Sequence, residues 1–142
     1  MITSTRIPRL LAALIVALPA PGCDSLFDSS RDVATDAQVL VTGTSPIPLT
    51  LVLSNDYTRI LDAQTGEMVT TLIRADTLYL DLPIDRVYPF GEGARILVRL
   101  INPDSTVTAD VHMRVLLDRK EEVYNQRATM RNATLEYIFA YY

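Results

Sequence analysis

The chain has 142 residues, with 13 basic and 17 acidic side chains and a formal charge of −4 at pH 7. This length suits one domain with a single hydrophobic core. The acidic balance, and the lack of a basic patch with interleaved aromatic residues, argue against nucleic-acid binding.

The N-terminus has the pattern of an export signal. Residues 1–9 carry Arg6 and Arg9 and no acid, and residues 10–18 are uninterruptedly apolar. This apolar run is far shorter than the roughly 20 residues that a membrane-spanning helix needs. A basic start, a short apolar run and an exit of small residues and prolines therefore predict a cleaved signal peptide over residues 1–22.

The only cysteine, Cys23, follows this segment directly. Residues 20–23, Ala-Pro-Gly-Cys, resemble the bacterial lipobox, although Ala20 stands where leucine is usual and Pro21 is uncommon there. The resemblance implies a lipidated Cys23 as the mature N-terminus, with several acyl chains that suffice for stable anchoring. An exported protein with one thiol has no intramolecular disulfide partner. The alternative is ordinary cleavage near Ala20, which leaves a free thiol or an intermolecular disulfide.

Residues 23–36 are polar and acidic and predict a flexible tether between the lipid and a domain over residues 37–142. The location that follows is the bacterial cell envelope, with the domain facing the periplasm or the exterior. Asp24 leaves the choice between inner and outer membrane open. Because the chain is acidic, the lipid anchor rather than the domain is expected to hold the membrane.

From residue 37 onward the pattern alternates with period two and is interrupted by turn residues. We expect strands over residues 38–42, 49–53, 59–62, 68–73 and 78–82, with a corner at residues 45–48 and a turn at Asn55 and Asp56. Gly66 suits the loop of a hairpin between residues 59–62 and 68–73. Residues 83–93 are expected to form a long connection.

The second half continues in the same way. We expect strands over residues 95–101, 106–117, 123–126 and 134–142, with turns at residues 102–105 and 118–121. The strand at 106–117 is expected to be the longest. Together these elements predict an all-β, immunoglobulin-like antiparallel β-sandwich of about 7–8 strands, with a small β-barrel as the alternative.

The order of three segments resembles a known family. Residues 41–56 (VTGTSPIPLTLVLSND), 80–90 (LDLPIDRVYPF) and 96–126 (ILVRLINPDSTVTADVHMRVLLDRKEEVYNQ) are similar in layout to the MmpS-type membrane-anchored proteins of mycobacteria. The resemblance covers strands and turns rather than chemistry-bearing motifs, and Asp118-Arg119-Lys120 departs from the family's Asp-Gly-Lys turn. It implies an accessory to an export transporter and supplies no catalytic residue.

Few residues suggest catalysis or metal binding. His112, the only histidine, lies in mid-strand and lacks the further nitrogen or sulfur ligands that zinc prefers. Asp76, Asp81 and Asp85 are close in sequence and are weak candidates for calcium ligands, but no calcium-loop motif is present. We therefore expect no enzyme activity and no cofactor. A calcium-dependent binder or a small hydrolase remains an alternative, which clustering of these aspartates at one pocket would favour.

The C-terminal strand is rich in aromatic residues. Tyr137, Phe139 and Tyr141 project to one face of the predicted strand. They either pack inside the sheet or form a stripe for a partner, because tyrosine is enriched in the cores of interfaces. The sequence thus favours a non-catalytic, lipid-anchored binding or structural module, with an accessory subunit of an envelope export or assembly complex as the alternative.

Overall fold

The computed structural model describes residues 33–90 and 93–141, which form eight β-strands. Their bounds are β1 (Asp36–Thr44), β2 (Leu49–Leu61), β3 (Met68–Leu80), β4 (Ile84–Pro89), β5 (Arg95–Asn102), β6 (Ala109–Leu117), β7 (Glu121–Met130) and β8 (Ala133–Ala140). Across these residues no helix has the length and apolar character to cross a membrane. The predicted signal peptide, Cys23 and most of the predicted tether lie outside the described residues.

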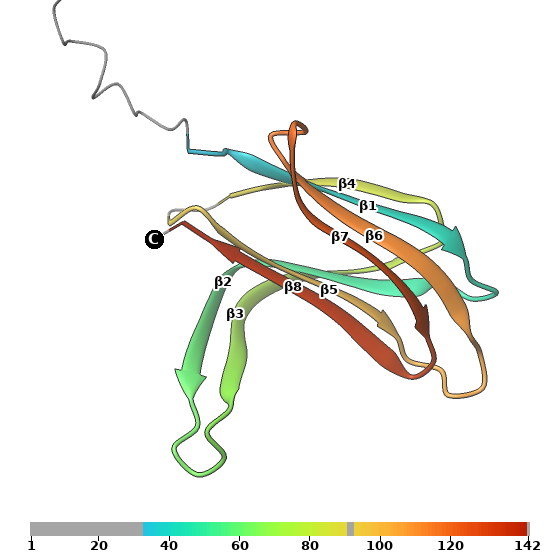
Figure 1. Cartoon of the computed structure of the whole chain (residues 1–142), viewed down its shortest axis with the longest axis horizontal. Coiled ribbons are helices and arrows are strands. Elements are labelled where there is room, and N and C mark those ends of the chain that lie inside the picture. Colours follow the sequence, from blue (N-terminus) through green and yellow to red (C-terminus); the bar gives the residue numbers. More distant parts are fainter. Residues whose placement is uncertain (1–32, 91–92, 142) are drawn as a thin grey trace, which may run out of the picture. The chain divides into compact units, whose positions relative to one another are not determined.

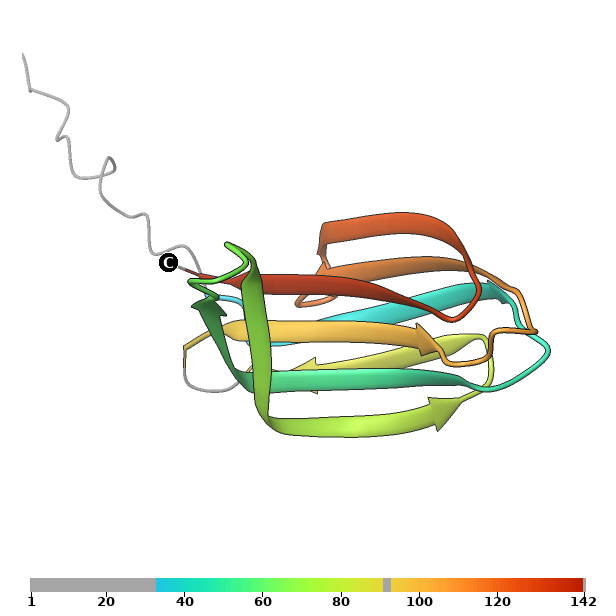
Figure 2. The same cartoon turned by 90° about the horizontal axis from the view of Figure 1, so that it is seen from below.

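The strands form two four-stranded antiparallel sheets, with the orders β4-β1-β6-β7 and β3-β2-β5-β8. Figure 1 shows the two sheets as stacked layers, and Figure 2 shows the second sheet from its outer side. The expected all-β sandwich is therefore confirmed.

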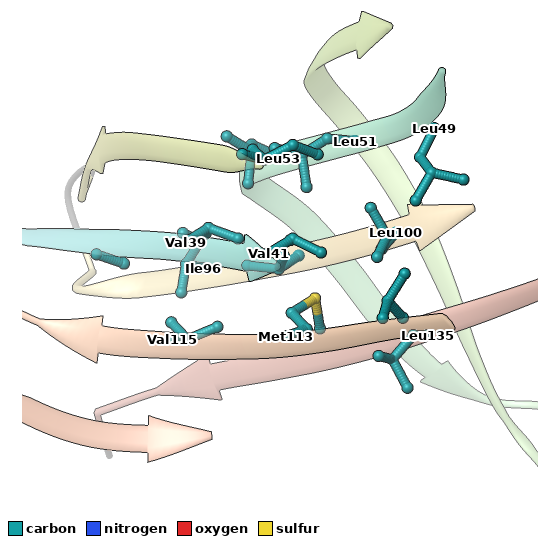
Figure 3. Packing of buried hydrophobic residues seen from close by; sticks show 14 of the residues in the cluster. Val39, Val41, Leu49, Leu51, Leu53, Ile96, Leu100, Met113, Val115 and Leu135 are labelled. Carbon is teal, nitrogen blue, oxygen red and sulfur yellow. The ribbon is translucent and has the colours of Figure 1, made fainter. Parts of the chain in front are cut away.

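The core forms because alternate residues of each strand point between the sheets. Val39 and Val41 of β1, with Met113 and Val115 of β6, come from the first sheet and are fully buried. Figure 3 shows them facing apolar side chains of the second sheet, which include Leu49, Leu51, Leu53, Ile96 and Leu100. Leu49, Leu51 and Leu53 of β2 thus point inward, as do Ala109, Val111, Met113 and Val115 of β6, in line with the period-two pattern of these segments.

The two sides of the sandwich, where the edge strands of the two sheets face each other, differ. At one side the edge strands β7 and β8 are bridged by Tyr124 and Tyr137, whose ring centroids are 4.7 Å apart. At the other side β3 and β4 are the edge strands, and a cleft lies between them. The β3–β4 side is therefore the side on which the sandwich is open.

The predicted turn at Asn55 and Asp56 is wrong, because both residues lie inside β2 at an irregularity in its pairing with β3. The buried Ser54 compensates for the ladder bonds lost there: its single hydroxyl hydrogen is shared between the carbonyl oxygens of Arg74 and Asp56, and its oxygen accepts from the Asp56 amide at 3.2 Å. Such bulges bend a strand. As a result, β2 and β3 are single strands of 13 residues each, where the sequence predicted shorter ones.

The predicted connection over residues 83–93 contains strand β4, which pairs with β1 from Val41↔Ile84 to Asp36↔Pro89. Ile84 is buried in the core, whereas the rest of β4 is polar or partly exposed, so its alternation is too weak to be recognised. The predicted longest strand at 106–117 is also wrong, since β6 has nine residues.

Two predicted hairpin loops are confirmed. Gly66 has φ = +72°, and its amide donates to the Asp62 carbonyl at 2.8 Å. Between β6 and β7, the amide of Lys120 donates to the Leu117 carbonyl at 2.9 Å. Asp118 and Arg119 both have positive φ, as a tight type I′ hairpin requires.

The ordered domain begins before residue 37, because Thr35 and Asp36 are already bonded to it. The Asp118 carboxylate accepts bonds from the backbone amides of Thr35 and Asp36, at 2.8 and 3.1 Å. These bonds hold the pKa of Asp118 below its ordinary value. The segment entering β1 is thereby fixed against the β6–β7 turn.

Candidate functional site: a projecting arm and the β3–β4 cleft

The ends of β2 and β3 continue beyond the sandwich as a two-stranded hairpin, here called the arm, which comprises residues 57–73. Figure 1 shows the arm projecting away from the two layers, and in the view of Figure 2 it passes across the ends of β5 and β8. Most of the exposed large apolar side chains of the described residues lie on it: Ile60, Leu61, Met68, Val69 and Ile73.

Within the paired part of the arm, residues 57–61 and 68–73, one face carries no charge. The pairs Thr58↔Thr71 and Ile60↔Val69 lie on this face, and Ile73 continues it along β3. We call these five residues the outer face of the arm. All five are β-branched and exposed, with Ile60 and Ile73 at 65% and 61% exposure. Such residues suit a pleated surface that is covered on one side. Exposed apolar patches of this kind mark interaction sites.

The opposite face of the arm is attached to the sandwich at its base. Tyr57 is buried, and its hydroxyl donates to the Phe139 carbonyl at 3.3 Å. The Arg95 guanidinium lies 5.1 Å from the centre of the Tyr57 ring, and its Nη2 is 3.5 Å from the Asp56 carboxylate. These contacts fix the direction in which the arm leaves the second sheet, so its outer face is held toward solvent.

The cleft between β3 and β4 is a cavity of about 350 Å³, lined by Leu53, Ala75, Asp76, Thr77, Leu78, Arg86, Val87 and Tyr88. Burial raises the pKa of Tyr88 above its ordinary value, and the neighbouring, hydrogen-bonded Asp76 raises it further. The cleft therefore combines an apolar floor with an acid, a guanidinium and a phenol, which are groups that can bind a ligand.

The three aspartates that the sequence singled out do not meet at one pocket. Asp76 lines the β3–β4 cleft, whereas Asp81 and Asp85 line a separate hollow near Pro83. Asp85 also accepts a bond from the Gln38 side chain at 2.8 Å. Among residues 33–90 and 93–141 no group of three or more His, Cys, Asp and Glu side chains is placed to hold a metal ion. Their arrangement thus gives no support to calcium binding.

His112 lies on the outer surface of the first sheet within a polar network. Its Nε2 atom is 2.7 Å from the Asn125 side-chain oxygen, and the Asn125 amide donates to Glu122 at 2.7 Å. Hydrogen bonds from Asn125 and Arg114 hold the pKa of Glu122 below its ordinary value. The side chains around His112 bind one another across strands β6 and β7, as expected for a solvated face of a sheet.

The C-terminal aromatic residues pack against the core. Tyr137 contacts Tyr124, and Phe139 stacks on Phe90 with ring centroids 6.1 Å apart. Tyr141 meets Phe139 edge to face at 4.9 Å. The three side chains are partly buried: Tyr137 and Phe139 lie on β8, the edge strand of the second sheet, and Tyr141 follows its end. These contacts close the side and the end of the sandwich. The other predicted site residue, Cys23, lies outside the described residues.

The exposed apolar residues of the arm were missed by the sequence analysis. The available signal was the segment 69–73 (Val-Thr-Thr-Leu-Ile), in which four of the five residues are β-branched and neither alternate face is strictly polar. A half-buried strand of a sandwich normally has one.

No protein-family model matches this chain, and no curated protein or solved structure matches it significantly. The resemblance in layout to the MmpS-type proteins therefore rests on the order of strands and turns alone.

Proposed function

We propose that this chain is a non-catalytic, lipid-anchored β-sandwich of the bacterial cell envelope that acts by binding another protein. The observation that carries the proposal is the arm, whose apolar outer face is held toward solvent at its base by Tyr57 and Arg95. An apolar face of this kind is costly to leave uncovered in water, so its retention is explained by a partner.

The proposed anchor is Cys23, which follows Ala20, Pro21 and Gly22 at the end of the predicted signal peptide. Acyl chains on Cys23 would confine the domain to a membrane surface, and residues 24–32 would give it reach. This confinement restricts the partners to other proteins of the envelope.

The anchor is tested by comparing the full chain with Cys23→Ala after expression in a bacterial host. We expect the wild type to enter the detergent phase with an added lipid mass, and Cys23→Ala to stay in the aqueous phase. Ser25→Ala, two residues beyond the lipobox, is the matched control and should behave as the wild type. Lipidation would be refuted if the wild type and Cys23→Ala enter the same phase and neither carries an added lipid mass.

The arm is tested by Ile60→Thr, which keeps a β-branched side chain but removes much of its apolar surface. Tyr79→Thr is the control, because Tyr79 is 76% exposed on β3 but outside the arm. Both variants should keep the wild-type stability within about 0.5 kcal/mol, since both positions are exposed. In crosslinked membranes, Ile60→Thr should lose a partner that Tyr79→Thr retains. If Ile60→Thr retains every crosslinked partner of the wild type, the arm is not the binding surface.

The alternative function is an accessory subunit of an envelope export or assembly complex. The arm favours it because a projecting hairpin suits insertion into a larger assembly, and the layout resemblance to MmpS-type proteins points the same way. The two readings differ in the partner: the accessory reading requires that the protein crosslinked to the arm is a transporter or assembly component.

A further inference from the structure

The edge strand β3 is exposed to an unusual degree. It has 13 residues and none is buried, while within the described residues it pairs only with β2. The edge strand of the other sheet on the same side, β4, is short and carries Asp85, Arg86 and Pro89, which are typical protections against pairing with other chains. The arm part of β3, residues 68–73, carries no charged side chain. It therefore presents an unprotected edge.

The sequence of this edge is nearly symmetric about Thr71. Thr70 and Leu72 flank it on one face, and Val69 and Ile73 flank it on the other. When two identical strands pair antiparallel around a two-fold axis through Thr71, each Val69 lies opposite Ile73 of the second copy. Thr71 then lies opposite itself. Threonine pairs and pairs of β-branched residues are favourable cross-strand neighbours.

We propose that the arm binds a second copy of this chain through antiparallel pairing of β3 about Thr71. The pairing joins two hairpins into a four-stranded sheet with the order β2-β3-β3-β2. The same face of both arms lies on one side of this sheet, because the two-fold axis is perpendicular to it. Ile60, Val69 and the second copy's Ile73 then form one row, since Ile60 already pairs with Val69.

The register is selective, which favours a second copy over an unrelated strand. Pairing about Thr70 would place Ile73 opposite Glu67, and pairing about Leu72 would place Val69 opposite Ala75. Among these three registers, only the one about Thr71 pairs Val69 with Ile73 and Thr71 with itself, and it places Glu67 opposite the small Ala75. The inference goes beyond the proposed function, because it requires neither the lipid anchor nor another protein, and it leaves the outer face open.

The test is disulfide crosslinking of the full chain in membranes under mild oxidation. Thr71→Cys should form a covalent dimer, because facing residues of paired strands have Cα atoms about 5 Å apart, within disulfide range. Ile73→Cys is the matched control. In this register two copies of residue 73 are offset by four residues along the strands, about 13 Å, so they should not crosslink. The parent chain, with Cys23 alone, sets the background.

A second variant checks the register independently. Val69→Cys with Ile73→Cys in one chain should crosslink, although neither single variant does. Equal crosslinking of Thr71→Cys and Ile73→Cys would show random collision and overturn the proposal, as would the absence of any covalent dimer. An adduct of Thr71→Cys whose mass is not twice that of the chain would also overturn it, and would identify the occupant of the edge as another protein.

Discussion

The backbone carbonyl oxygen of Asp110 occupies the space in which a side chain on Gly43 would begin. A Cβ atom on Gly43 would lie 2.0 Å from this oxygen, and φ at Gly43 is +131°. Because Gly43 and Asp110 belong to the paired strands β1 and β6, neither backbone can retreat without breaking the first sheet. Gly43, one residue beyond the predicted strand over residues 38–42, is thus required by a close approach of two backbones.

Gly43→Ala is therefore expected to destabilise the domain by about 3 kcal/mol or more, through both overpacking and backbone strain. Gly66→Ala is the matched control, because Gly66 also has positive φ but has no atom within 4 Å of the added Cβ. It should cost only about 1 kcal/mol. Denaturant unfolding measures both, and equal losses would show that the contact with Asp110 does not matter.

Asp118 should make stability depend on pH. Its folded pKa is lowered chiefly by the backbone amides of Thr35 and Asp36, so its contribution is present above the unfolded pKa, near 4, and is lost as pH falls through the folded pKa. The stability advantage of the wild type over Asp118→Asn should therefore shrink steadily below about pH 4. Urea unfolding at successive pH values checks this, and a constant difference between the two proteins would contradict it.

Arg119 is expected to limit stability. Its φ is +59°, in the left-handed region that costs a non-glycine residue roughly 1–2 kcal/mol. Arg119→Gly should therefore raise the free energy of unfolding by up to about 1 kcal/mol, after the greater chain entropy of glycine is deducted. Asp118→Gly is the control: its φ is also positive, but it loses the bonds to Thr35 and Asp36 and should not stabilise. A melting temperature for Arg119→Gly below that of the wild type would contradict the argument.

Leu97 should behave as a core residue although it points away from the core. Leu97 lies on β5 between the inward-facing Ile96 and Val98, and it pairs with Ser54 of β2. Its side chain is fully buried. Leu97→Ala is therefore expected to cost about 2–5 kcal/mol. Ile101→Ala, on the same strand and face but partly exposed, should cost less than half as much. Similar small losses for both variants in denaturant unfolding would show that the outer face of the second sheet is not covered at Leu97.

Asp76→Asn should lower the pKa of the Tyr88 phenol, because it removes a negative charge and changes a hydrogen bond. The pKa should nevertheless stay above its ordinary value, since burial is the larger cause. Titration of tyrosines labelled at Cζ by NMR measures this. Asp81→Asn, which lines a different hollow, should leave Tyr88 unchanged. If the pKa of Tyr88 is unaltered in Asp76→Asn, then Asp76 does not interact with Tyr88.

Local pattern predicted most strands correctly where each had one strongly apolar face. The stretches 49–53 and 109–115 are examples, because their leucine, valine and methionine residues at alternate positions have one way to become buried. Gly66 and residues 118–121 marked hairpin loops for equally local reasons, namely the need for positive φ. Pattern failed at β4, where only Ile84 is buried and pairing with β1 supplies the strand's stability.

The amino-acid sequence by itself determined the class of this protein: an all-β domain with hairpins around Gly66 and residues 118–121, preceded by a segment with the features of a lipoprotein signal. Those properties follow from side-chain alternation, turn residues and the placement of Cys23, each readable within a few residues. The tertiary structure alone decided that Asn55 and Asp56 form a bulge rather than a turn, because the hydroxyl of Ser54 replaces the lost ladder bonds. The bulge lets β2 and β3 run on past the sandwich as the arm. The exposure of the arm depends on contacts between distant residues such as Tyr57 and Phe139, which no local pattern encodes.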